Sequence, residues 1–190
     1  MQKFTVKSFN LKPPVHKFPD IESLGETELD LVKLVIKLCY FPNPETCKEI
    51  NTAVFPTIRA QPKFRRFSVQ KIESRKLLRD DNTSPTWALM WSHVIGRVTP
   101  PKNGWIFAHV WQASQDAEGY TAPYNLVLMP EFLGSLSDKN GPLARYFQYH
   151  AQSVYGLTPK GKNQVPKPAD FENLSFRYLP KVSKPQKFLT

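Results

Sequence analysis

Two short apolar stretches decide the fold of this chain: Gly104-Trp105-Ile106-Phe107-Ala108-His109-Val110-Trp111 and Asn125-Leu126-Val127-Leu128-Met129-Pro130. Both are apolar on either side of an extended backbone, which is typical of a strand buried on both faces. His109 is the polar side chain within the first stretch, and Asn125 opens the second stretch 16 residues later. The pattern predicts a β-hairpin with a polar loop, in which the histidine faces the asparagine.

Helical signals flank this hairpin. The sequence predicts a first helix that follows Ser23 and ends near Pro42, and further helices over residues 45–53, 131–136 and 142–155. A capping box of Ser23 and Glu26 precedes the first helix, Asn43 caps the second, and Gly156 stops the last. We therefore expect an α+β fold, with a central ββα element (hairpin plus helix) surrounded by helices and extended basic arms.

Length and composition bound the class of protein. The chain has 190 residues, 41% of them hydrophobic and 13% aromatic, which suits one folded domain. We expect a globular domain over residues 1–156 and a basic, proline-containing extension over residues 157–190 packed on it. No apolar run reaches the roughly 18 residues needed to cross a bilayer, and the N-terminal stretch lacks the apolar core of a signal peptide. The expectation is a cytoplasmic protein with no membrane partner.

The net charge of +10 favours a polyanionic partner, above all a nucleic acid. Residues 59–79 hold eight basic side chains against one acid, with apolar residues between them. They predict a half-buried ribbon with a basic outer face, either a track for backbone phosphates or a solvated surface. The candidate nucleic-acid contacts are Arg59, Lys63, Arg65, Arg66, Lys71, Arg75, Arg97 and Arg145.

His109 is the candidate catalytic side chain. Strand alternation places it with Trp105, Phe107 and Trp111 on one face, so the imidazole needs a polar partner. Asn125 could accept a hydrogen bond from one ring nitrogen. The other nitrogen would then be free to take a proton from water, a role that suits the ordinary histidine pKa of about 6.5.

This arrangement resembles the HNH nucleases of the ββα-metal superfamily over residues 104–150. The resemblance implies that His109 is the general base, that Asn125 holds the hairpin, and that a single Mg²⁺ or Mn²⁺ assists hydrolysis of a DNA phosphodiester. The implied metal ligands are His109, Asp138 and His150, with Asn140 as a further candidate. Two positions depart from the family pattern, since Ala108 replaces an aspartate and Leu133 or Gly134 stands where a histidine or asparagine is usual.

Several alternatives stay open. His93 could be the strand histidine instead of His109, and His150 lies on a helix face that suits a structural role. The tryptophans and the two cysteines, Cys39 and Cys47, are typical of a core. The preferred function is a restriction or other defence endonuclease, which would act as a homodimer if it cuts both strands. The alternatives are a non-catalytic nucleic-acid-binding protein and a phage or ribosome-associated assembly protein.

Overall fold

The structure, a computed structural model, describes residues 28–54, 57–59, 69–72, 75–80, 104–138 and 141–183. The chain combines α-helices, 3-10 helices (η) and strands, so the predicted α+β class is confirmed. In chain order the elements are α1 (Glu28–Ile36), α2 (Pro44–Glu49), β1 (Thr57–Arg59), β2 (Val69–Ile72), β3 (Arg75–Asp80), β4 (Trp105–His109), η2 (Pro123–Asn125), β5 (Leu126–Pro130), η3 (Glu131–Ser137), α4 (Ala144–Tyr155) and η4 (Phe171–Asn173).

The β4–β5 hairpin lies at the centre of the molecule. Its strands are antiparallel, with Trp105 opposite Pro130 and His109 opposite Leu126. All residues of β5 are buried, and Tyr40 extends the sheet by exchanging two main-chain hydrogen bonds with Leu128. The predicted buried hairpin is therefore present. The element directly after β5 is η3, which packs on both strands, and α4 begins only at Ala144.

The two faces of the hairpin pack on different clusters. Ala108 joins the large core with α1 and α4, whereas Phe107 joins a smaller cluster with Ile50 and Leu179. Trp111 lies in the large core with Ala108, so its predicted placement on the Phe107 face is wrong. The alternation ends because β4 stops at His109 and the backbone then turns, reaching a positive φ of 48° at Gln112.

The helix boundaries follow local signals. The side chain of Asn43 accepts a hydrogen bond from the Glu45 N–H at 3.0 Å, which confirms the predicted cap of α2. Gly156 ends α4 in the left-handed region at φ 67°, also as predicted. The first two helices are shorter than predicted, ending at Ile36 and Glu49. Ser23 and Glu26 lie outside the described residues.

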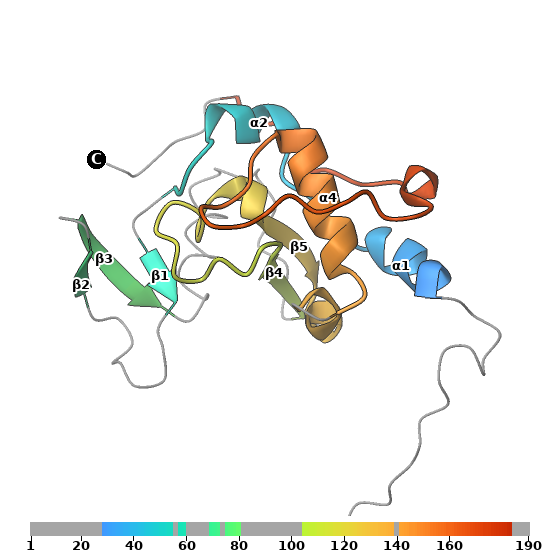
Figure 1. Cartoon of the computed structure of the whole chain (residues 1–190), viewed down its shortest axis with the longest axis horizontal. Coiled ribbons are helices and arrows are strands. Elements are labelled where there is room, and N and C mark those ends of the chain that lie inside the picture. The colour runs from blue at the N-terminus through green and yellow to red at the C-terminus, as the bar shows by residue number, and fades with distance from the viewer. Residues whose placement is uncertain are drawn as a thin grey trace, which may run out of the picture.

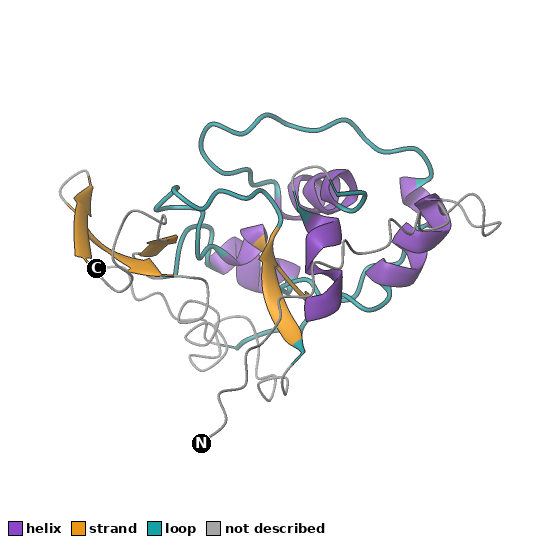
Figure 2. Cartoon of the chain, turned by 90° about the horizontal axis from the view of Figure 1, so that it is seen from below, coloured by secondary structure: helices purple, strands orange, loops and turns teal. Residues whose placement is uncertain are grey.

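The basic segment forms a small three-stranded sheet in the order β1-β3-β2, with β1 parallel and β2 antiparallel to β3. Figure 1 places this sheet at one end of the molecule and α1 at the other, with the hairpin and α4 between them. Figure 2 shows the strands of this sheet to one side of the hairpin and of the helices. The predicted basic ribbon is therefore a separate layer beside the core.

The C-terminal segment packs on the core in extended form. The Phe41 N–H donates to the Arg177 carbonyl at 2.8 Å, and the Phe41 carbonyl accepts the Leu179 N–H at 2.7 Å. Leu179 is buried, and Phe171, Leu174 and Phe176 pack against the large core. Within the described part of the chain, no helix is both long enough and apolar enough to span a bilayer.

Candidate active site around His109

His109 ends β4 and has a fixed orientation. Its Nε2 lies 2.9 Å from the Tyr120 carbonyl oxygen, and its ring stacks on the Tyr120 ring with centroids 4.8 Å apart and planes 8° apart. A carbonyl oxygen can only accept, so Nε2 carries the proton and donates it. In the neutral ring the lone pair is therefore on Nδ1, which is the tautomer that a base at Nδ1 needs.

Asn125 makes no hydrogen bond to the imidazole, so the expected bond between them is wrong. Its Oδ1 accepts from the Trp111 N–H at 2.8 Å, and its Nδ2 donates to the Gly119 carbonyl at 2.9 Å. The side chain is fully buried. Asn125 thus ties together both ends of the loop between the strands. Because Tyr120 follows Gly119 directly, Asn125 positions the carbonyl that orients His109.

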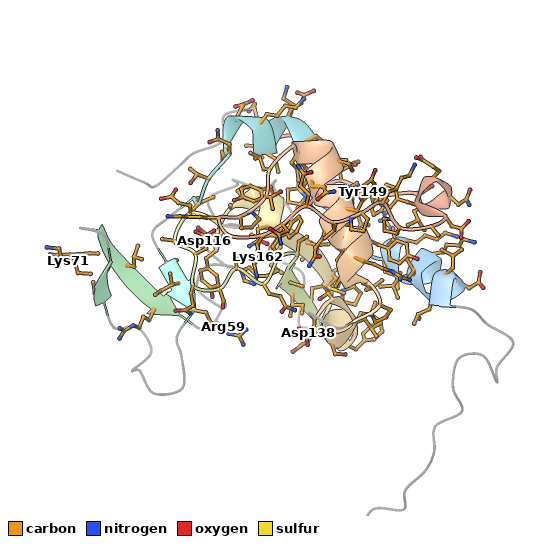
Figure 3. The ribbon with its side chains drawn as sticks, viewed as in Figure 1. Arg59, Lys71, Asp116, Asp138, Tyr149 and Lys162 are labelled. Carbon is orange, nitrogen blue, oxygen red and sulfur yellow. The ribbon has the colours of Figure 1, made fainter. Side chains whose placement is uncertain are left out.

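A polar cavity of about 350 Å³ opens beside His109. Its walls come from three elements: His109 from β4, Arg59 from β1 and Asp138 from the end of η3. Figure 3 shows Arg59 and Asp138 along the same edge of the molecule. A base, a cation and a carboxylate from distant parts of the chain therefore meet at one cavity.

Two hydrogen bonds to the main chain of Arg59 hold it beside this cavity. The Arg59 N–H donates to the Ser114 carbonyl at 2.8 Å, and Gln115 Nε2 donates to the Arg59 carbonyl at 2.8 Å. Both partners belong to the loop between β4 and β5. The loop therefore holds the end of β1 against the hairpin, and the Arg59 side chain stays exposed.

Asp138 is positioned by a tight turn after η3. Its N–H donates to the Ser135 carbonyl, and its carbonyl accepts from the Gly141 N–H at 2.7 Å. A Cβ at Gly141 would lie only 2.1 Å from the Leu136 carbonyl oxygen, so this close approach requires glycine. The carboxylate itself is exposed.

The environment of His109 keeps its ring neutral. Burial lowers the pKa of His109 to about 4, and the charge of Arg59 lowers it too, while the hydrogen bond to Tyr120 acts in the opposite direction. The ring is therefore uncharged at pH 7 and able to accept a proton. An anion bound beside Arg59 would raise this pKa, because it would favour the protonated ring.

His150 lies in a different place. Its ring stacks on Phe176 with centroids 3.7 Å apart and meets Phe41 edge-on at 4.5 Å. Nε2 lies 3.3 Å from the Tyr178 hydroxyl, and burial lowers the pKa of His150 to about 3. His150 does not line the cavity that His109 and Asp138 share. The predicted three-ligand set is therefore not brought together, and His150 has the surroundings of a core side chain.

The predicted nucleic-acid contacts that the structure describes lie on different elements. Lys71 extends from β2 at the far edge of the small sheet, away from the cavity (Figure 3). Arg145 is exposed at the start of α4, with its guanidinium 5.1 Å from the centre of the Tyr146 ring. Arg75 begins β3, but its side chain is not described. The remaining contact candidates, Lys63, Arg65, Arg66 and Arg97, lie outside the described residues. So do His93, the alternative strand histidine, and Asn140, the further candidate for a metal ligand.

Two of the predicted metal ligands, His109 and Asp138, line the cavity. Among the described residues, no three His, Cys, Asp or Glu side chains gather as a metal-binding group. Mg²⁺ commonly uses one or two carboxylates, with water and substrate phosphate as its other ligands. Because Nδ1 of His109 has one lone pair, it can serve as base or as metal ligand, but not as both at once.

Sequence reasoning missed Tyr120, whose ring and carbonyl contact His109. The turn residues at Asp116 and Gly119 indicate a bend in the loop, but no spacing rule says which carbonyl returns to the strand. It also missed that Gln112, Ser114 and Ser137 line the cavity. Comparisons with protein-family models, with curated proteins and with solved structures found no match to this chain.

Proposed function

We propose that this chain hydrolyses phosphodiester bonds of a nucleic acid, with a divalent metal ion, at the cavity beside His109. The observation that carries the proposal is the placement of His109, Arg59 and Asp138 on one cavity, with the imidazole held as the Nε2–H tautomer. The net charge of +10 supports a polyanionic substrate.

The resemblance to HNH nucleases supports the proposal, because the positions of the family's motif residues lie at this cavity. Ala108 and Gly134 occupy the places where that family carries polar motif residues, and both line the cavity. Asp138 lies four residues beyond Gly134 and contributes a carboxylate to the same walls. The proposal therefore uses a ligand displaced along the chain, and takes η3 and α4 together as the helical part of a ββα element.

Each side chain has one role in the proposed reaction. Arg59 binds the phosphate oxygens. Nδ1 of His109 takes a proton from a water molecule as the water oxygen bonds to phosphorus, and the bond from phosphorus to the leaving oxygen breaks. Asp138 holds the Mg²⁺ or Mn²⁺, which when bound stabilises negative charge on the phosphate and the leaving oxygen. Asn125 acts as a positioning residue through the loop that carries Tyr120.

Supercoiled plasmid incubated with the purified full chain in Mg²⁺, Mn²⁺ or EDTA tests this function. We expect nicking or linearisation that depends on metal, and a loss of about 10²–10⁴-fold in rate for His109→Ala. His150→Phe is the matched control, since it removes a different buried histidine, and it should keep the activity. Arg59→Ala should mainly weaken substrate binding.

Cleavage by His109→Ala at the rate of the unchanged protein would contradict the assignment. If His109→Ala fails to fold, as judged by circular dichroism, His109→Asn provides a second test with a polar side chain. An intact plasmid together with a salt-sensitive gel shift would favour the alternative of a non-catalytic nucleic-acid-binding protein.

A further inference from the structure

A second, larger cavity adjoins the one at His109. It measures about 530 Å³ and lies between the loop 112–118 and the turn that carries Lys160 and Lys162. Gln112 and Ser114 line both cavities, so the two hollows share a wall. Gln115 also lines the second cavity and donates to the Arg59 carbonyl, which links the two sites through one side chain.

The turn with the two lysines is fixed beside the loop. The Lys162 N–H donates to the Pro159 carbonyl at 3.1 Å, and Gly161 adopts a φ of 75° between the lysines. Pro159 is buried against Gly119, where an added Cβ would lie 3.2 Å from the Pro159 Cβ. Lys160 and Lys162 therefore lie on a short turn that packs against the loop carrying Tyr120, the residue that orients His109.

Both acids at this cavity have oxygens engaged within the fold. Oδ1 of Asp116 accepts the Glu118 N–H at 2.9 Å, whereas Oδ2 of Asp116 is buried without a hydrogen-bond partner. The Glu118 carboxylate accepts a hydrogen bond from the Thr52 hydroxyl. These contacts hold the carboxylates to their own loop and to α2's C-terminal side, not to the lysines across the cavity.

Lys160 and Lys162 differ from other lysines of the C-terminal segment. Lys167 pairs with Glu172, and Lys181 pairs with Glu45. Lys160 and Lys162 are exposed, and no carboxylate in the described part of the chain forms an ion pair with either of them. Among the lysines of this segment that the structure describes, the two without an ion pair are thus the two that line the cavity.

We propose that the second cavity binds the phosphates next to the reacting one, so that a single nucleic-acid strand runs from Arg59 across Gln112 to Lys160 and Lys162. This inference rests on the proposed function, because it takes the cavity at His109 as the place of the reacting phosphate. Lys160 and Lys162 supply the positive charge along this path, whereas Asp116 and Glu118 line the same cavity and are bonded to their own loop and to Thr52. Contacts between lysines and the phosphate backbone bind strands with little sequence preference. Amide and hydroxyl groups on the shared wall suit sugar and phosphate contacts.

Binding without cleavage tests the strand path. The probe is a fluorescein-labelled 12-nucleotide oligodeoxythymidine, measured by fluorescence anisotropy in EDTA at several NaCl concentrations. Each phosphate neutralised on a single strand contributes about 0.7 to the slope of log K against log [NaCl]. We expect the double variant Lys160→Ala with Lys162→Ala to lower that slope by about 1.4.

The matched control is the double variant Lys167→Ala with Lys181→Ala, which removes the same charge from the same segment. It should change the slope by much less. His109→Ala should keep the full slope, so a failure of the proposed hydrolysis and a failure of this strand path give different results. Thermal unfolding of each variant checks that these exposed substitutions leave the fold intact.

Three results would overturn the inference. The first is an unchanged slope for the Lys160 and Lys162 variant, and the second is an equal loss in the matched control, which would indicate net charge alone. The third is that thymidine monophosphate displaces the labelled probe at the same concentration as the unlabelled 12-mer does. That result would indicate a site for an isolated phosphate.

Discussion

Replacing His150 by phenylalanine should remove a large part of the acid sensitivity of this fold. His150 is 2% exposed, and burial lowers its pKa from 6.5 to about 3. Below pH 6.5 the unfolded chain binds a proton at this residue that the folded chain does not bind. The free energy of unfolding therefore falls as the pH drops from about 6.5 toward 3.

The magnitude follows from the two pKa values. Each pH unit inside this window costs about 1.4 kcal/mol, so His150 should lower the free energy of unfolding by about 2.5 kcal/mol between pH 7 and pH 4.5. Since pH 4.5 lies above the folded pKa, the loss depends mainly on the unfolded value. The tyrosines around the ring, Tyr155 and Tyr178, have raised pKa values and do not titrate in this range.

Urea unfolding at pH 7 and at pH 4.5 measures this effect. The unchanged protein should lose about 2.5 kcal/mol more than His150→Phe over this range, because the contribution of His109 is common to both proteins. Any packing cost of the larger ring is independent of pH and cancels in the difference. Tyr178→Phe removes the hydroxyl near Nε2 and should keep the full loss. If His150→Phe loses as much stability as the unchanged protein between pH 7 and pH 4.5, burial does not keep His150 neutral in the folded protein.

One further substitution and one labelling reaction test the core. Asn125→Ala leaves a buried N–H and a buried carbonyl without their partner, so the free energy of unfolding in urea should fall by roughly 2–5 kcal/mol; a loss below 1 kcal/mol would refute the role of the amide. Burial raises the pKa of Cys39 to about 12 and raises that of Cys47 as well, so neither thiol should react with a disulfide reagent until the protein unfolds. Rapid labelling of the native protein would show that these thiols are accessible.

The elements with local signals were predictable. Both apolar stretches form strands, as predicted, and all of β5 is buried. In β4 only Phe107 and Ala108 are buried, whereas Trp105 is exposed and so does not lie in the core as expected of the tryptophans. Asn43 and Gly156 end their helices where expected, since caps depend on the residue itself and on its nearest neighbours. The ends of α1 and α2 were placed too far along the chain, where apolar residues continue after the helix has stopped.

Contacts that depend on the path of a loop were not predictable. Trp111 continues the alternation of β4 in the sequence, yet the backbone turns after His109 and takes the indole to the other face. Arg59 and Asp138 are 79 positions apart in the chain, and only the β1 bonds to Ser114 and the turn at Gly141 bring them to one cavity. Spacing rules describe neighbours within one element, so they cannot supply such pairs.

The asparagine of the hairpin shows how a correct residue can be assigned the wrong contact. Sequence reasoning placed the Asn125 amide on the imidazole, because both are polar groups in an apolar hairpin and each needs a partner. The loop satisfies each need separately: the amide binds main-chain groups of Trp111 and Gly119, and the imidazole binds the carbonyl of Tyr120. The amide therefore affects His109 indirectly, through the loop segment that carries Gly119 and Tyr120. A substitution at Asn125 should alter stability and the orientation of the imidazole together, whereas a substitution at His109 should leave the loop in place.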